Sequence, residues 1–279
     1  MENLDNKYIV RIEDLKINIS NKTIVDYSTI NIPYGKTVII EGPNGSGKST
    51  FLNILAGQGG DYCKLISGKI YIYAKEIHDY SLDELKRKIV NINQEEAFLT
   101  NESAFHYLMR PALTAISSFK NKKELTNKIK KMIYQFYSNY LYKFFVDEIK
   151  NPGRAEKFRK NPQKDLKFMY LKKANNLSGG QKKMLHLISG IIKAKVAECN
   201  LILLDEPLNN LDKDNKKTLI SILKELRLSN PNVTILLITH CRIFPGIKDI
   251  IKIKNKNNVN KAIYESFDNE LPNYNCLEN

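Results

Sequence analysis

Short apolar runs that end in polar clusters indicate the fold class of this chain. Three runs, 37–40, 201–204 and 234–238, are typical of buried strands. Each is followed closely by polar residues: a glycine-rich stretch after the first, Asp205 and Glu206 after the second, and His240 after the third. The carboxyl ends of parallel strands meet at one edge of a sheet, where ligands bind. The pattern therefore predicts an α/β fold with a single site at that edge.

The remaining patterns predict an antiparallel flank and a helical middle. The runs 8–12, 24–32 and 70–73 are β-branched or alternating and are typical of strands. Between Leu125 and Phe144, apolar residues recur at spacings of three and four, which predicts an amphipathic helix. The segment 255–279 is expected to be a poorly ordered polar tail.

Composition is that of a folded globular protein, with 42% hydrophobic and 27% charged residues among 279. No apolar run approaches the roughly 18 residues that span a bilayer, and the amino terminus lacks the pattern of a secretory signal. We therefore expect a cytoplasmic chain without a transmembrane segment. The four cysteines are scattered, so neither a zinc site nor a disulfide framework is expected.

The formal charge of +14 is concentrated in one stretch, 120–173, which has 16 basic and 5 acidic residues. A solvated helical face explains this excess most simply. Contact with anionic lipid headgroups is a second interpretation. A third interpretation is binding of nucleic acid, because tyrosines are interleaved with the lysines.

The glycine-rich stretch has the spacing of a phosphate-binding loop, Gly42-x-x-x-x-Gly47-Lys48-Ser49. Glycines let backbone N–H groups turn toward phosphate oxygens, and the helix that follows presents its positive end. Lys48 would reach the β and γ phosphates, and Ser49 would ligate Mg²⁺. The expected nucleotide-binding residues here are Gly42, Pro43, Asn44, Gly45, Ser46, Gly47, Lys48, Ser49 and Thr50.

Two further motifs complete the candidate chemistry. Asp205 can hold Mg²⁺, because this hard cation prefers carboxylate oxygen near the phosphates it bridges. Glu206 is placed to polarise an attacking water. The stretch 177–181, Leu-Ser-Gly-Gly-Gln, opens a helix with Ser178 near its N-cap. Such an end can bind a second anion, although a plain capped helix has the same pattern.

With these motifs in this order, the chain resembles the ATP-binding-cassette (ABC) ATPases. The order also includes Gln94 at a strand end and the loop 208–212. The resemblance implies a P-loop NTPase core with a mainly parallel sheet, an antiparallel β flank and an inserted helical subdomain. It places a nucleotide-binding domain at 1–254, with the helical subdomain at about 95–176. The segment 81–86 resembles that of exporter-type cassettes.

The resemblance also implies roles for single residues around ATP and Mg²⁺. Two cassettes pair head to tail, so that ATP held by one is covered by Ser178, Gly179, Gly180 and Gln181 of the other. Glu206 is then the general base, and His240 contacts the γ-phosphate. Gln94 reaches Mg²⁺ and the attacking water, and Asp212 links the two sites. The position at which many family members stack an aromatic ring on adenine falls near Ile19, which would offer only apolar contact. Relative to the family, the segment 195–199 resembles a small insertion and is expected to lengthen a loop.

These observations predict the ATP-binding and ATP-hydrolysing subunit of an ABC transporter. Its expected partners are a second cassette, in a homodimer, and a separate transmembrane subunit, with the chain peripheral on the cytoplasmic face. The alternative is a soluble ATP-driven switch that acts on nucleic acid or the ribosome. Its single cassette and lack of sustained heptads disfavour that alternative. A non-hydrolysing scaffold is disfavoured by the intact Lys48, Asp205, Glu206 and His240.

Overall fold

The computed structural model describes residues 7–19, 23–59, 63–93, 101–115, 121–142, 156, 169–170, 172–240, 244, 247–256 and 259–271. The chain divides into two compact units. The first, the sheet unit, comprises 1–94, 199–209 and 220–279. The second, the helical unit, comprises 95–198 and 210–219, and so takes in the segment that the sequence predicts as a helical subdomain.

The strands of the described residues form one sheet of eleven strands in the sheet unit. Ten follow the order β6-β5-β1-β2-β11-β10-β4-β9-β8-β7, and β3 pairs with β1 outside this order. Their bounds are β1 Tyr8–Ile19, β2 Thr23–Tyr27, β3 Ile30–Pro33, β4 Thr37–Glu41, β5 Cys63–Ile72, β6 Lys75–Glu76, β7 Ile89–Ile92, β8 Leu201–Asp205, β9 Thr234–Ile238, β10 Asp249–Lys256 and β11 Val259–Ser266.

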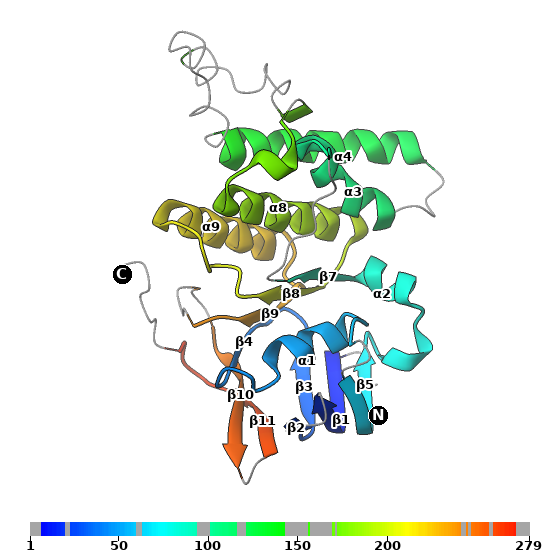
Figure 1. Cartoon of the computed structure of the whole chain (residues 1–279). Helices are drawn as coiled ribbons and strands as arrows, with labels where there is room; N and C mark the ends of the chain where they lie inside the picture. Colours follow the sequence, from blue (N-terminus) through cyan, green and yellow to red (C-terminus); the bar gives the residue numbers. More distant parts are fainter. Residues whose placement is uncertain are drawn as a thin grey trace. The chain divides into compact units, whose positions relative to one another are not determined.

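The parallel part of the sheet, β10-β4-β9-β8-β7, carries the strands predicted from apolar runs. All five residues of both β8 and β9 are buried, which is why their sequences are continuous rather than alternating. Helix α1 (Lys48–Leu55) follows β4 and buries Phe51, Leu52 and Leu55. In Figure 1, β4, β9, β8 and β7 lie side by side within the sheet unit. The prediction of a parallel core is confirmed.

The predicted antiparallel flank is present, with different limits. β1 pairs antiparallel with β2, β3 and β5, and it runs beyond the predicted residue 12 to Ile19. The predicted single strand 24–32 is wrong, because the exposed Ser28 and Thr29 interrupt it and leave β2 and β3. Two short strands can each pair with β1, which a single long one could not do at the same positions.

The expected polar tail from 255 is wrong for most of its described residues. β10 continues to Lys256, and β11 returns beside it as the second strand of a hairpin. β11 also pairs in parallel with β2, so it joins the antiparallel flank to the parallel core. Its inward residues are Asn260 and Ala262, and this small polar and apolar pair hid the alternation.

The helical unit is built on α8 (Gly179–Ala197), against which α3 (Ala104–Ala115) and α4 (Lys122–Phe136) pack, as Figure 1 shows. α4 buries Ile129, Ile133 and Phe136, which confirms the amphipathic pattern, and a π-helical turn, Tyr137–Leu141, follows it. The loop expected at 195–199 is wrong for 195–197: Val196 is buried, so the apolar stripe of α8 continues through it. Outside this group, the described residues also form η2 Ile77–Asp79 and α2 Leu82–Lys88 in the sheet unit, η5 Ala174–Asn176 in the helical unit, and α9 Lys213–Ser229, whose residues fall in both units.

Candidate active site

The phosphate loop joins β4 to α1 and turns through two glycines in the left-handed region. Gly45 has φ 74° and Gly47 has φ 92°, which side chains other than glycine rarely adopt. Gly47 is the N-cap of α1, and among the described side chains none caps this end and none in its first turn is acidic. The first backbone N–H groups of α1 are therefore presented to an anion.

Lys48 lies at the centre of this loop. Its side chain is buried, and Nζ donates hydrogen bonds of 2.9 Å to the carbonyl oxygens of Gly42 and Pro43. Burial lowers the pKa of Lys48, whereas the carboxylates of Glu206 and Asp205 act in the opposite sense. The ammonium group is thus held over the loop, and it interacts electrostatically with the two carboxylates at the end of β8.

The β10–β11 hairpin backs the phosphate loop. A Cβ at Gly42 would lie 2.9 Å from the carbonyl oxygen of Ile253 and 2.9 Å from Ser46 Oγ, so no larger residue fits. Asn260 of β11 is buried; its Nδ2 lies 3.5 Å from the carbonyl oxygen of Ser46, and its Oδ1 accepts a 3.0 Å hydrogen bond from Asn255 Nδ2. No sequence motif points to Asn260, because its position depends on β11, which lies in the segment that was expected to be a tail.

Asp205 and Glu206 follow each other at the end of β8 and differ in exposure. Asp205 is buried beside Ile238 of β9. Glu206 has a left-handed backbone, φ 46°, and its N–H donates to the carbonyl oxygen of Ile238 at 3.0 Å. Its Oε1 lies 3.7 Å from Nε2 of His240, whose side chain is largely exposed. The structure therefore brings the residues after β4, β8 and β9 together, as the strand pattern predicted.

Asn209 contacts Glu206 at two points. Its backbone N–H donates to the carbonyl oxygen of Glu206 at 3.2 Å, and its side-chain Nδ2 donates to Glu206 Oε2. Asn209 lies in the loop 208–212, but no role of its own was predicted for it. The available signal was an amide three residues after the acid, a spacing at which side chains of a turn can meet.

The 177–181 motif opens α8 in the helical unit with a complete capping box. Ser178 Oγ accepts from the N–H of Gln181 at 3.4 Å, and Gln181 Oε1 accepts from the N–H of Ser178 at 3.0 Å. Ser178 and Gly179 are exposed, and a Cβ at Gly179 would meet no atom of the described residues within 4 Å. A Cβ at Gly180 would meet the carbonyl oxygen of Asn210 at 3.6 Å. The cap leaves the Ser178 hydroxyl proton available to an acceptor outside the unit.

Three residues named from the family resemblance are not part of the geometry given above. Gln94 lies outside the described residues, as does the side chain of Ile19. Asp212 lies at the start of α9 and accepts hydrogen bonds from the backbone N–H and the Nδ2 of Asn215, at 2.8 and 2.7 Å. Asp212 therefore caps α9 within this chain.

The site has the donor set that a nucleotide triphosphate and Mg²⁺ require. The glycine loop, the end of α1 and buried Lys48 suit anionic phosphate. The exposed Ser49 and the buried Asp205 supply a hydroxyl and a carboxylate, the oxygen ligands that Mg²⁺ combines with phosphate and water. The residues present therefore fit both groups.

A half-buried histidine lies on α8 beyond the 177–181 motif. His186 Nδ1 is 2.6 Å from the hydroxyl oxygen of Tyr107 on α3. Burial, with Lys183 and Arg110 nearby, lowers the pKa of His186 to about 4. The imidazole is therefore neutral near pH 7, and the hydrogen bond ties α8 to α3.

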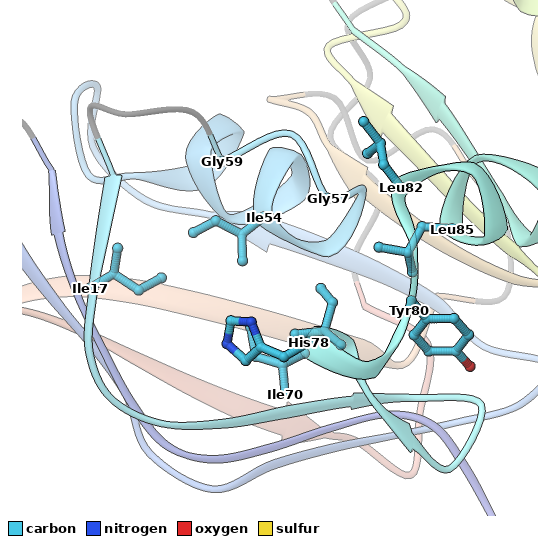
Figure 2. Close-up of a pocket in the computed structure, with 10 residues that line it drawn as sticks. Ile17, Ile54, Gly57, Gly59, Ile70, His78, Tyr80, Leu82 and Leu85 are labelled. Carbon is cyan, nitrogen blue, oxygen red and sulfur yellow. The ribbon is translucent and has the colours of Figure 1, made fainter.

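An apolar pocket of about 340 Å³ opens in the sheet unit between the end of α1 and α2. Figure 2 shows Ile54, Gly57 and Gly59 from the α1 side and Leu82 and Leu85 from α2, with His78 between them and Ile70. Leu82 is 46% exposed at its edge. This segment carries both acidic and basic residues: Asp79, Asp83 and Glu84, and Lys86, Arg87 and Lys88.

The helical unit carries part of the basic stretch. On α4, Lys122, Lys123, Lys128, Lys130 and Lys131 are exposed. Much of 143–168 lies outside the described residues. Within the part of the chain that the structure describes, every helix is too short or too polar to cross a bilayer.

Comparison with known proteins gives consistent matches. The family model described as ABC transporter matches residues 25–209. The lipoprotein-releasing system ATP-binding protein LolD of Treponema denticola is 28% identical over 229 residues, which cover 81% of this chain and 84% of that protein. The phosphate import ATP-binding protein PstB of Pyrobaculum aerophilum is 27% identical, covering 81% of this chain and 78% of its own length.

Solved structures share the fold. The dimeric bacterial ABC transporter cassette MJ0796 has a TM-score of 0.64 and 21% sequence identity, and the match covers 93% of this chain and 99% of that one. CbiO1 from Clostridium perfringens, part of the ABC transporter complex cbiONQ, has a TM-score of 0.56 and 24% identity, covering 93% and 89% of the two chains. The α/β core with its helical unit is therefore the fold of ABC cassettes.

Proposed function

Since this chain belongs to the ABC transporter family and is one of its ATP-hydrolysing subunits, we propose that it works as a head-to-tail pair of cassettes bound to a separate membrane-spanning partner. The observation that carries the proposal is the exposed, self-capped end of α8 at Ser178 and Gly179. A binding motif with open space around it suits a ligand held by another molecule. The chain then lies at the cytoplasmic face of a membrane.

In each composite site, the phosphate loop holds ATP by the α1 N-terminus and Lys48. Ser49, Asp205 and, by resemblance, Gln94 would hold Mg²⁺, which would neutralise the charge on the β and γ phosphates. Glu206 accepts a proton from the attacking water, a bond forms from that water oxygen to the γ phosphorus, and the bond to the bridging oxygen of ADP breaks. His240 steadies the γ-phosphate.

Opposite this site, the partner copy's 177–181 motif supplies the cover. Ser178 keeps its Oγ lone pair on the N–H of Gln181 and can donate its hydroxyl proton to a phosphate oxygen. The backbone N–H groups at the start of α8 add the positive end of a helix. Loss of the γ-phosphate removes these contacts, and the pair opens.

The apolar pocket of Figure 2 is the docking surface that we propose for the membrane-spanning partner. Its lining is mostly apolar, so it suits an apolar side chain on a segment of that partner. Leu82→Glu should abolish co-purification with the partner. Leu228→Glu is the matched control, because Leu228 on α9 is 84% exposed and outside the pocket.

The pairing is tested with Glu206→Gln, which should bind ATP, hydrolyse it very slowly and elute as a dimer in gel filtration with ATP. Wild-type turnover by this variant would remove Glu206 as the base. Recovery of the chain in a membrane fraction only with a co-expressed multi-span protein tests the partner. Salt-sensitive binding of RNA or DNA that stimulates turnover would instead support the soluble switch.

A further inference from the structure

Asn209 holds Glu206 at both ends of the residue. The Asn209 backbone N–H donates to the Glu206 carbonyl oxygen at 3.2 Å, and Nδ2 donates to Oε2 of the carboxylate. Within the same unit, the Glu206 N–H donates to Ile238 of β9 at 3.0 Å. The residue is therefore fixed at its amide, its carbonyl and its carboxylate.

The backbone of Glu206 explains why so many bonds are needed. Its φ of 46° lies in the left-handed region, which a glutamate adopts rarely and keeps only where its surroundings enforce it. The backbone hydrogen bond from Asn209 closes the turn that holds Glu206 in this conformation. The side chain of Asn209 also restrains the carboxylate of Glu206, which is the proposed base.

The two carboxylate oxygens have different neighbours. Asn209 donates to Oε2, whereas Oε1 lies 3.7 Å from His240 Nε2. We propose that Asn209 is a positioning residue that turns Oε1 of Glu206 toward the side of His240, where water would attack the γ-phosphate. This inference rests on the proposed role of Glu206 as the base.

The physical reason is the hydrogen bond to a charged acceptor, which is stronger than one between neutral groups and fixes the plane of the carboxylate. Without it the carboxylate samples other rotamers, and the fraction with an oxygen directed at the water falls. The contacts that Asn209 makes here are with Glu206, so its removal should change turnover more than affinity.

The test is steady-state ATP hydrolysis by four variants. Asn209→Ala should lower kcat about tenfold and leave KM within about twofold. Asn209→Asp has the same size but lacks the donor and adds a like charge, so its kcat should be at least as low. Asn209→Gln keeps the donor and should recover part of the rate. Asn232→Ala, a change at an exposed asparagine before β9, should have no effect.

Single-turnover assays with radiolabelled ATP separate positioning from a general effect on the loop. In a Glu206→Ala background, Asn209→Ala should cause no further loss, because the group on which it acts is absent. Equal losses in both backgrounds, or a fully active Asn209→Asp, would overturn the inference. If Glu206→Ala itself turns over normally, the base assignment fails. If Glu206→Ala is inactive and Asn209→Ala is normal, only the role of Asn209 fails.

Discussion

Gly179→Ala separates the stability of the cassette from its pairing. Gly179 is the first residue of α8, it is exposed, and an added Cβ would meet no atom within 4 Å in the part of the chain that the structure describes. Alanine is also the better helix former, by up to about 1 kcal/mol. The variant should therefore unfold at the wild-type temperature or slightly above it, and its monomer should bind ATP normally.

The substitution should instead weaken dimerisation. In the proposed pair, the start of α8 approaches a phosphate of the other copy, and the new methyl group stands in that approach. A hydrogen bond to a charged group contributes about 1.5–3 kcal/mol. Two equivalent sites lose it, so dimerisation should weaken at least about a hundredfold.

The assay is sedimentation equilibrium with ATP in a Glu206→Gln background, so that hydrolysis does not open the pair. Gly59→Ala is the matched control, because among the described residues its Cβ would meet only Ile54 Cγ1, at an ordinary 3.4 Å. If Gly179→Ala dimerises as tightly as its parent, the end of α8 does not face a phosphate, and the composite site is wrong.

Three further predictions concern binding and stability. Lys48→Ala should reduce ATP affinity at least about a hundredfold, because it removes the buried charge of the loop; equilibrium titration with a fluorescent nucleotide measures this. Asn260→Ala should lower the free energy of unfolding by about 1–2 kcal/mol and weaken ATP binding several-fold, since it removes support from Ser46; urea titration and the same nucleotide assay measure both. His186 has its folded pKa lowered to about 4, below its usual 6.5, so the stability it confers is present above pH 6.5 and is lost as pH falls toward 4, by up to about 3 kcal/mol. Thermal unfolding across that range should show a smaller loss for His186→Gln, and an equal loss would assign the effect to other groups.

The parallel core could be predicted from the sequence because buried strands leave continuous apolar runs. β8 and β9 are buried along their whole length, and each ends directly before the polar residues of the site. The phosphate loop could also be predicted from the sequence, because its motif lies within one short stretch. Gly45 and Gly47 of that stretch have a left-handed backbone, which favours glycine. These features are local in sequence, so a short window contains the information that determines them.

Features that depend on distant contacts were missed. β11 is half polar, and only its pairing with β2 and β10 makes it a strand. The support that Asn260 gives the phosphate loop follows from that pairing. The contact between Asn209 and Glu206 could not be predicted for another reason. The backbone and side chain of Asn209 reach Glu206 because Glu206 has a left-handed backbone, and no sequence pattern indicates that conformation for a glutamate.

The place of β11 has a consequence for how the sheet assembles. β11 pairs with β2, from which it is far apart in the sequence, and with its neighbour β10. Without β11 the edges of β2 and β10 would be open, and open edges invite pairing with other chains. A chain truncated before β11 should therefore aggregate, and restoring that strand should restore a product that stays in solution.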